Sequence, residues 1–240
     1  MHRSRGQGDE FNLLGLIFDV ALRMTRCLSV LSREAGWRLQ AILRPKRFFS
    51  QKQLINLYKC QVLSYIESGI PGYYHAAPSN CRLLDRVQER LLRELHLSAK
   101  DALNWYNLAP LNARRDIAIL GLLYRIVYGL APPQLCSLFP FQEQTSRAIT
   151  RLGVRRHQLQ LFEPSFRTDI YRRSLFGLIV VWNLLPQEVV SLGTIQSFQS
   201  ALQRALKKAI SLDISRWWMI FSPSERILDA FRFQDLFGNS

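Results

Sequence analysis

The sequence lacks the features that mark secreted, membrane-spanning or metal-binding proteins. Its four cysteines never form a close pair, so neither a zinc module nor a disulfide framework is indicated. Its longest apolar runs, 117–131 and 175–186, fall short of the roughly 20 residues that a spanning helix needs. Residues 1–10 are polar and resemble no signal peptide. We therefore expect an intracellular protein, nuclear or cytoplasmic, with no transmembrane segment and a disordered N-terminus at 1–10.

Catalytic constellations are also missing. There is no P-loop, no dinucleotide-binding fingerprint and no nucleophile elbow, and the four histidines are isolated from one another and from the cysteines. Asp85, Glu89, Asp101 and Asp116 lie dispersed among arginines, where surface ion pairs explain them. We expect no catalytic, cofactor-binding or metal-binding residue, and no enzyme activity from the chain alone.

Positive charge is what the sequence has in excess. The formal net charge is +14, and 26 of the 32 basic residues are arginines, whose planar fork suits bidentate phosphate contacts. Residues 1–60 carry 11 basic against 4 acidic side chains, and residues 141–175 carry 7 against 3. This localised excess favours nucleic acid as the partner, with a membrane surface or an acidic protein as the alternatives.

The apolar periodicity predicts a mainly α fold, a helical bundle with one short N-terminal β-strand and a smaller C-terminal helical unit. The aromatic run 11–19 predicts the strand, although it contains a glycine. Three-to-four spacing of apolar residues, with capping residues and prolines at the boundaries, predicts the helices. They are expected at 20–43, 50–69, 84–95, 110–129, 174–184, 195–210 and 222–238.

Two basic segments are the candidate phosphate-binding sites. In the loop Arg44-Pro-Lys-Arg-Phe-Phe49, the cations could hold phosphates, while Phe48 and Phe49 could either stack on bases or anchor the next helix to the core. In the segment 141–168, Arg147, Arg151, Arg155 and Arg156 precede His157, and we favour phosphate contact there. Arg82, Arg86, Arg90 and Arg93 flank an apolar stripe, so we assign them to a solvated face.

Several segments match one family in the family's own order. The pattern Leu13-Leu-Gly-Leu-Ile-Phe-Asp19, the segment Leu108-Ala-Pro-Leu-Asn-Ala-Arg-Arg115 and the run Trp182-Asn-Leu-Leu-Pro186 are three examples. With the matches at 57–58, 64–68, 83–88, 123–133, 150–151 and 197–202, they resemble LINE-type (non-LTR) retrotransposon reverse transcriptases over residues 11–210. The matched part of the family is the C-terminal thumb and connector region downstream of the catalytic palm.

The resemblance implies a domain plan and a function. It implies a palm-edge strand plus thumb-like bundle at 11–140 and a basic connector at 141–173. The C-terminal helical unit at 174–240 follows from the apolar periodicity, and its residues 211–240 lie beyond the resemblance. The family's catalytic aspartates precede the Leu-Gly strand and have no counterpart here, so no catalytic residue is carried over. The implied function is to bind the backbone of RNA or an RNA–DNA template–primer beside the palm and fingers of the parent polymerase. The phosphate-binding residues expected are Arg44, Lys46, Arg47, Arg114, Arg115, Arg147, Arg151, Arg155 and Arg156.

Two other functions remain open. A protein-interaction scaffold, or a degenerate element fragment with no retained activity, would leave the arginines incidental. The second possibility is peripheral attachment to a membrane through the aromatic residues of 217–237.

Overall fold

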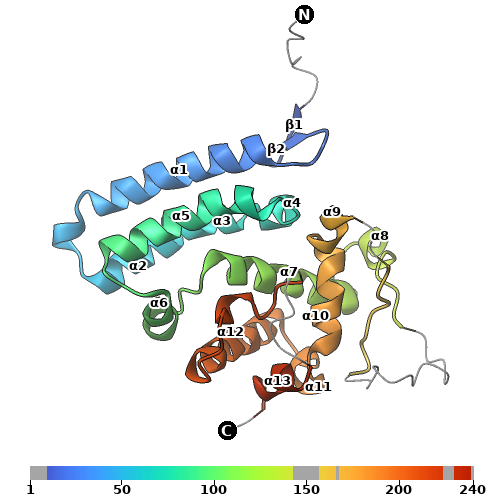
Figure 1. Cartoon of the computed structure of the whole chain (residues 1–240). Coiled ribbons are helices and arrows are strands. Elements are labelled where there is room, and N and C mark those ends of the chain that lie inside the picture. The colour runs from blue at the N-terminus through green and yellow to red at the C-terminus, as the bar shows by residue number, and fades with distance from the viewer. Residues whose placement is uncertain (1–9, 143–156, 166–167, 224–229, 239–240) are drawn as a thin grey trace, which may run out of the picture. The chain divides into compact units, whose positions relative to one another are not determined.

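The computed structural model describes residues 10–142, 157–165, 168–223 and 230–238, and most of them are helical, as the apolar periodicity predicts (Figure 1). The predicted fold class is confirmed. The chain divides into two compact units between Leu111 and Asn112, and each unit is described by itself. In the part of the chain that the structure describes, no helix has the length and apolar character needed to cross a membrane.

The N-terminal segment forms a β-hairpin instead of the single strand expected at 11–19. Strands β1 (Glu10–Leu13) and β2 (Leu16–Asp19) pair antiparallel, with Phe11 opposite Phe18. Leu14 and Gly15 both have positive φ, of 51° and 82°, which is the backbone of a tight two-residue hairpin turn. The glycine inside the apolar run therefore reverses the chain.

Helix α1 (Thr25–Leu43) begins later than the expected Val20. The Asp19 carboxylate accepts hydrogen bonds from the backbone N–H groups of Arg23, at 3.0 Å, and Met24, at 2.8 Å, and so closes a turn before the helix. Val20 is consequently exposed, contrary to its predicted place on the buried stripe. The rest of that stripe is buried as predicted: Met24, Cys27, Leu31, Ala35, Leu39 and Ile42.

A short 3-10 turn leads from α1 into an interrupted helical segment. Ser50 and Gln53 form the predicted capping box, in which each side chain accepts a hydrogen bond from the other's backbone N–H. The helix expected at 50–69 contains a π-helical stretch in its middle. The elements are η1 (Lys46–Phe48), α2 (Gln51–Tyr58), the π-helix η2 (Lys59–Leu63), α3 (Ser64–Glu67) and α4 (Ile70–Tyr73).

Helix α5 (Pro78–Glu94) packs along α1, and Figure 1 shows the two running side by side. Its apolar stripe is buried and its arginines at 82, 86, 90 and 93 are exposed, as predicted. Helix α6 (Ala99–Tyr106), capped by Ser98, completes the first unit. Helix α6 was not predicted, because so short a helix, with only Ala102 and Leu103 buried, shows little periodicity.

The second unit contains α7 (Leu111–Val127) from Asn112 onward, although we expected this helix in the first bundle. The ring of Tyr124 on α7 lies 5.1 Å from that of Phe198 on α12, and Gly121 faces Gln199. This packing explains why the chain divides before α7 and not in the expected connector at 141–173. The helix expected at 195–210 is confirmed as α12 (Ile195–Ser211).

The other helices of this unit are short. The helix expected at 174–184 starts as a 3-10 turn and continues as α10, and the capping pattern expected at 222–225 lies partly outside the described residues. These elements are α8 (Pro133–Cys136), α9 (Asp169–Arg172), η3 (Leu175–Leu178), α10 (Ile179–Leu184), α11 (Gln187–Val190), η4 (Trp217–Met219) and α13 (Ala230–Asp235).

Candidate nucleic-acid interface

The loop that joins α1 to α2 presents its three cations to solvent. Arg44 follows the last residue of α1, and Pro45 prevents the helix from continuing. The 3-10 turn η1 then carries Lys46 and Arg47, and all three basic side chains are exposed. The structure therefore places Arg44, Lys46 and Arg47 on one accessible loop, as the sequence predicts.

An ion pair joins this loop to the end of α5. Lys46 Nζ lies 2.7 Å from Glu94 Oε2. The hydrogen bond from Lys46, and then its charge, lower the pKa of Glu94, and the charges of Arg90 and Arg93 contribute to the same shift. Gln51 at the start of α2 also donates a hydrogen bond to the Leu95 carbonyl, at 2.9 Å. The loop and the last turns of α5 therefore form one surface.

We call this surface the basic end and define it as Arg44, Lys46, Arg47, Arg90 and Arg93. Within the described residues, Lys46 alone of these five takes part in an ion pair. Arg90 and Arg93 are exposed, as expected for a solvated face, and both lie close enough to Glu94 to lower its pKa, as Lys46 does. The spacing of residues along α5 could not have revealed the link to the loop, because Lys46 is distant from Glu94 in the sequence.

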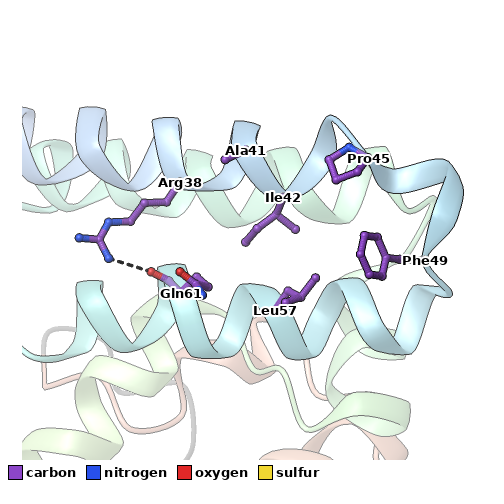
Figure 2. Close-up of a pocket in the computed structure, with 7 residues that line it drawn as sticks. All are labelled: Arg38, Ala41, Ile42, Pro45, Phe49, Leu57 and Gln61. Atoms are coloured by element: carbon purple, nitrogen blue, oxygen red, sulfur yellow. Dashed lines mark hydrogen bonds between the residues drawn. The ribbon is translucent and has the colours of Figure 1, made fainter.

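The two adjacent phenylalanines of the loop have different surroundings. Phe49, which is 39% exposed, lines a pocket of about 310 Å³ between α1 and the start of α2, together with Ile42, Pro45 and Leu57 (Figure 2). Phe48 is 71% exposed. The Arg47 guanidinium lies over the Phe48 ring, with Cζ 4.6 Å from the ring centroid. Of the two rings, Phe49 therefore faces the neighbouring helices more than Phe48 does.

Arg38 lines the same pocket, on the side away from Phe49 (Figure 2). It donates a hydrogen bond to the Gln61 carbonyl at 3.2 Å, and its Cζ lies 4.0 Å from the centroid of the Tyr65 ring. Burial raises the pKa of Tyr65, the Glu34 carboxylate adds to this rise, and Arg38 opposes it. Arg38 thus bridges α1 to the following helical segment, and the pocket walls are mainly apolar.

Arg114 and Arg115 lie near the start of α7, in the second unit. Arg114 is half-buried, whereas Arg115 is only 6% exposed and has a buried neighbour in Asp116. Consecutive residues on a helix point about 100° apart, and here that offset leaves Arg114 partly accessible and buries Arg115. The expectation that Arg115 binds phosphate is therefore corrected, because its side chain is not at the surface.

The structure describes the connector only in part. Arg147, Arg151, Arg155 and Arg156 lie outside the described residues. His157, which we grouped with them, is buried, so its expected phosphate contact is wrong. Its Nε2 donates to the Trp182 carbonyl at 3.0 Å, and its Nδ1 accepts from the Leu159 N–H at 3.2 Å. His157 thus holds the connector to α10.

The neighbouring Trp182 and Asn183 serve the same purpose. Trp182 Nε1 donates to the Leu159 carbonyl at 2.8 Å, and the Asn183 side chain hydrogen-bonds to both backbone groups of Leu161. Both side chains are buried. The Trp-Asn motif singled out in the sequence thus fixes residues 159–161, and no binding role is needed to explain it.

Metal-ligating side chains do not gather in the part of the chain that the structure describes. No cluster of three or more histidine, cysteine, aspartate or glutamate side chains there is arranged to hold a metal ion.

Comparisons of this chain with protein-family models, with curated proteins and with solved structures found no match. The similarity to LINE-type reverse transcriptases therefore rests on the sequence motifs alone.

Proposed function

We propose that this chain is a non-catalytic nucleic-acid-binding fragment, similar to the thumb and connector region of a LINE-type reverse transcriptase. In this proposal it holds RNA or an RNA–DNA template–primer by its phosphates, in the nucleus or cytoplasm. The observation that supports it best is the contact between Lys46 and Glu94, which joins the 44–47 loop to Arg90 and Arg93. Five cations from two distant segments thereby share one surface.

Such a surface suits a phosphate backbone better than a base sequence. Arginine and lysine contacts to phosphates provide affinity by releasing counterions, and they carry no sequence information. Glu94 lies beside the basic end and competes for Lys46, so bound phosphates would have to displace it. Binding is therefore expected to be salt-sensitive and almost independent of sequence.

The test is titration of an RNA–DNA hybrid over a range of salt concentrations. Replacing Arg44, Lys46 and Arg47 with glutamine should weaken binding and reduce the salt slope by about 0.9 for each phosphate that is no longer neutralised. Helix content measured by circular dichroism should not change, because all three side chains are exposed.

The matched control replaces Arg23, Arg33 and Arg82 with glutamine and so removes the same charge from exposed positions elsewhere in the first unit. Along the helix axes, Arg82 lies about 12 Å from Arg90, the nearest member of the basic end on α5, and Arg33 lies about 16 Å from Arg44 on α1. The side chain of Asn80 donates a hydrogen bond to the Arg23 carbonyl. The control should retain most of the affinity. Equal losses from both triple variants would mean that only net charge matters, and the proposal of a localised site would be abandoned.

The N-terminal hairpin supports the second expected partner, the palm and fingers of a parent polymerase. In the described residues β1 pairs only with β2, so its outer edge has no strand beside it. Phe11, Leu13 and Leu14 are exposed large apolar side chains, whereas Leu16 and Phe18 of β2 pack close to Gly69 and Gly72. We propose that this edge packs on the palm. The isolated chain should give no primer extension with Mg²⁺, and templated synthesis would disprove its non-catalytic assignment.

A further inference from the structure

Phe48 has an arrangement that phosphate binding alone does not require. Its ring is 71% exposed and lies within the basic end, between the loop cations and the pocket-lining Phe49. The Arg47 guanidinium covers one face of the ring. The backbone of η1 holds both residues in a 3-10 turn, so the ring is presented on an ordered element.

An aromatic ring in this position selects for a particular state of nucleic acid. Bases inside a continuous duplex are already stacked on their neighbours, so a ring outside the helix cannot reach their faces. Unpaired bases, in contrast, stack readily on phenylalanine, and neighbouring arginines add cation–π attraction. Phosphates contact the same cations in either state. The ring therefore favours nucleic acid that offers an unpaired base.

We infer that the basic end binds single-stranded nucleic acid, or the unpaired overhang of a hybrid, with one base stacked on the open face of Phe48. The inference rests on the proposed function, because the flanking phosphates are held by Arg44, Lys46 and Arg47. It adds a preference for unpaired over fully paired substrate. Arg47 then serves twice, since it supports the ring from behind and attracts the backbone.

The experiment uses the full chain and three fluorescent probes: a blunt RNA–DNA hybrid, the same hybrid with a single-stranded overhang, and that overhang with abasic sites. The wild-type chain should prefer the overhang. Phe48→Ala should lower affinity for the overhang about tenfold, which corresponds to the loss of one base–aromatic stack. It should leave binding to the blunt and abasic probes unchanged, and the salt slope unaltered.

Two further variants keep the result interpretable. Phe48→Trp retains a stacking surface and should restore affinity for the overhang, which a merely structural role would not predict. Phe49→Ala should lower the melting temperature, because Phe49 lines the pocket between α1 and α2.

The inference is overturned if Phe48→Ala has the same effect on all three probes, or no effect on any. If the glutamine triple still reduces the salt slope in that case, the phosphate-binding proposal survives and only the stacking is wrong. If neither variant changes binding, both proposals fail.

Discussion

The side chain of Asn183 pairs with Leu161 as a neighbouring β-strand would. Its Oδ1 accepts the Leu161 N–H at 2.9 Å, and its Nδ2 donates to the Leu161 carbonyl at 2.8 Å. Both residues are buried, so water cannot replace these bonds. Asn183 also donates to Glu163 at 3.0 Å. One amide side chain at the end of α10 thus fixes a segment that has little regular structure of its own.

Asn183→Leu is therefore expected to destabilise the protein by about 3 kcal/mol, since each buried backbone group left without a partner costs about 1–3 kcal/mol. Urea unfolding monitored by circular dichroism would measure it. Hydrogen exchange at the Leu161 amide should accelerate in parallel. Glu188→Gln, at an exposed position on α11, is the control and should have little effect. Similar stability of the two variants would contradict the structural role of Asn183.

Tyr124 offers a test of the core of the second unit. Its ring is buried against Phe198 and Tyr128, and its hydroxyl donates to the Leu192 carbonyl. Tyr124→Ala should lower the free energy of unfolding by about 3 kcal/mol or more. Arg90→Ala, at an exposed site on α5, should change it by less than about 0.5 kcal/mol. Small effects at both positions would show that Tyr124 does not belong to the core of the second unit.

Glu94 should oppose nucleic-acid binding, because it neutralises Lys46 and repels phosphates. Glu94→Gln should therefore tighten binding to an RNA–DNA hybrid several-fold and raise the salt slope by up to about 0.9, the value for one more neutralised phosphate. Glu89→Gln is the control, since it removes the same charge from an exposed carboxylate on α5 that has no ion pair among the described residues. Weaker binding by Glu94→Gln would indicate that the ion pair is needed to position Lys46.

Asp19 should make stability depend on pH in the acid range. Burial raises the pKa of its carboxyl, but hydrogen bonds from the backbone N–H groups that precede α1 outweigh this, and the net pKa is below the ordinary value of 3.8. A lowered pKa in the folded state means that the stabilisation is complete above about pH 4 and is lost as the pH falls through the folded pKa. The melting-temperature difference between wild type and Asp19→Ala should therefore shrink below pH 4. A difference that persists there would exclude the carboxylate charge as its cause.

Local signals predicted the longer helices of this fold. The Ser50 capping box, the buried stripe from Met24 to Ile42 and the helix that follows Pro110 depend on neighbours within one or two turns, and spacing alone identifies them. The hairpin was missed because the aromatic run from Phe11 to Asp19 was interpreted as one continuous strand. The positive φ at Leu14 and Gly15 breaks it.

Long-range relationships could not be predicted in this way. Nothing in the local pattern shows that Lys46 contacts Glu94, or that Tyr124 packs on Phe198 and so assigns α7 to the second unit. Arg115 and His157 were placed at the surface because charged and titratable residues usually lie there, and tertiary packing buried both. Half of the candidate site was thus predicted from the sequence. The loop cations Arg44, Lys46 and Arg47 were predicted, whereas Arg90 and Arg93 on α5 were not.

The π-helical stretch Lys59–Leu63 has a consequence for how sequences related to this one can vary in length. A π turn holds one residue more than an α turn, and it arises where a single residue is inserted into a helix. Removing one residue between Lys59 and Leu63 would restore regular α geometry while α2 before it and α3 after it stay intact. The same deletion within α1 would rotate the following residues by about 100° and turn the Ala35–Ile42 stripe away from the core. Gaps of one residue in related chains should therefore concentrate at this stretch.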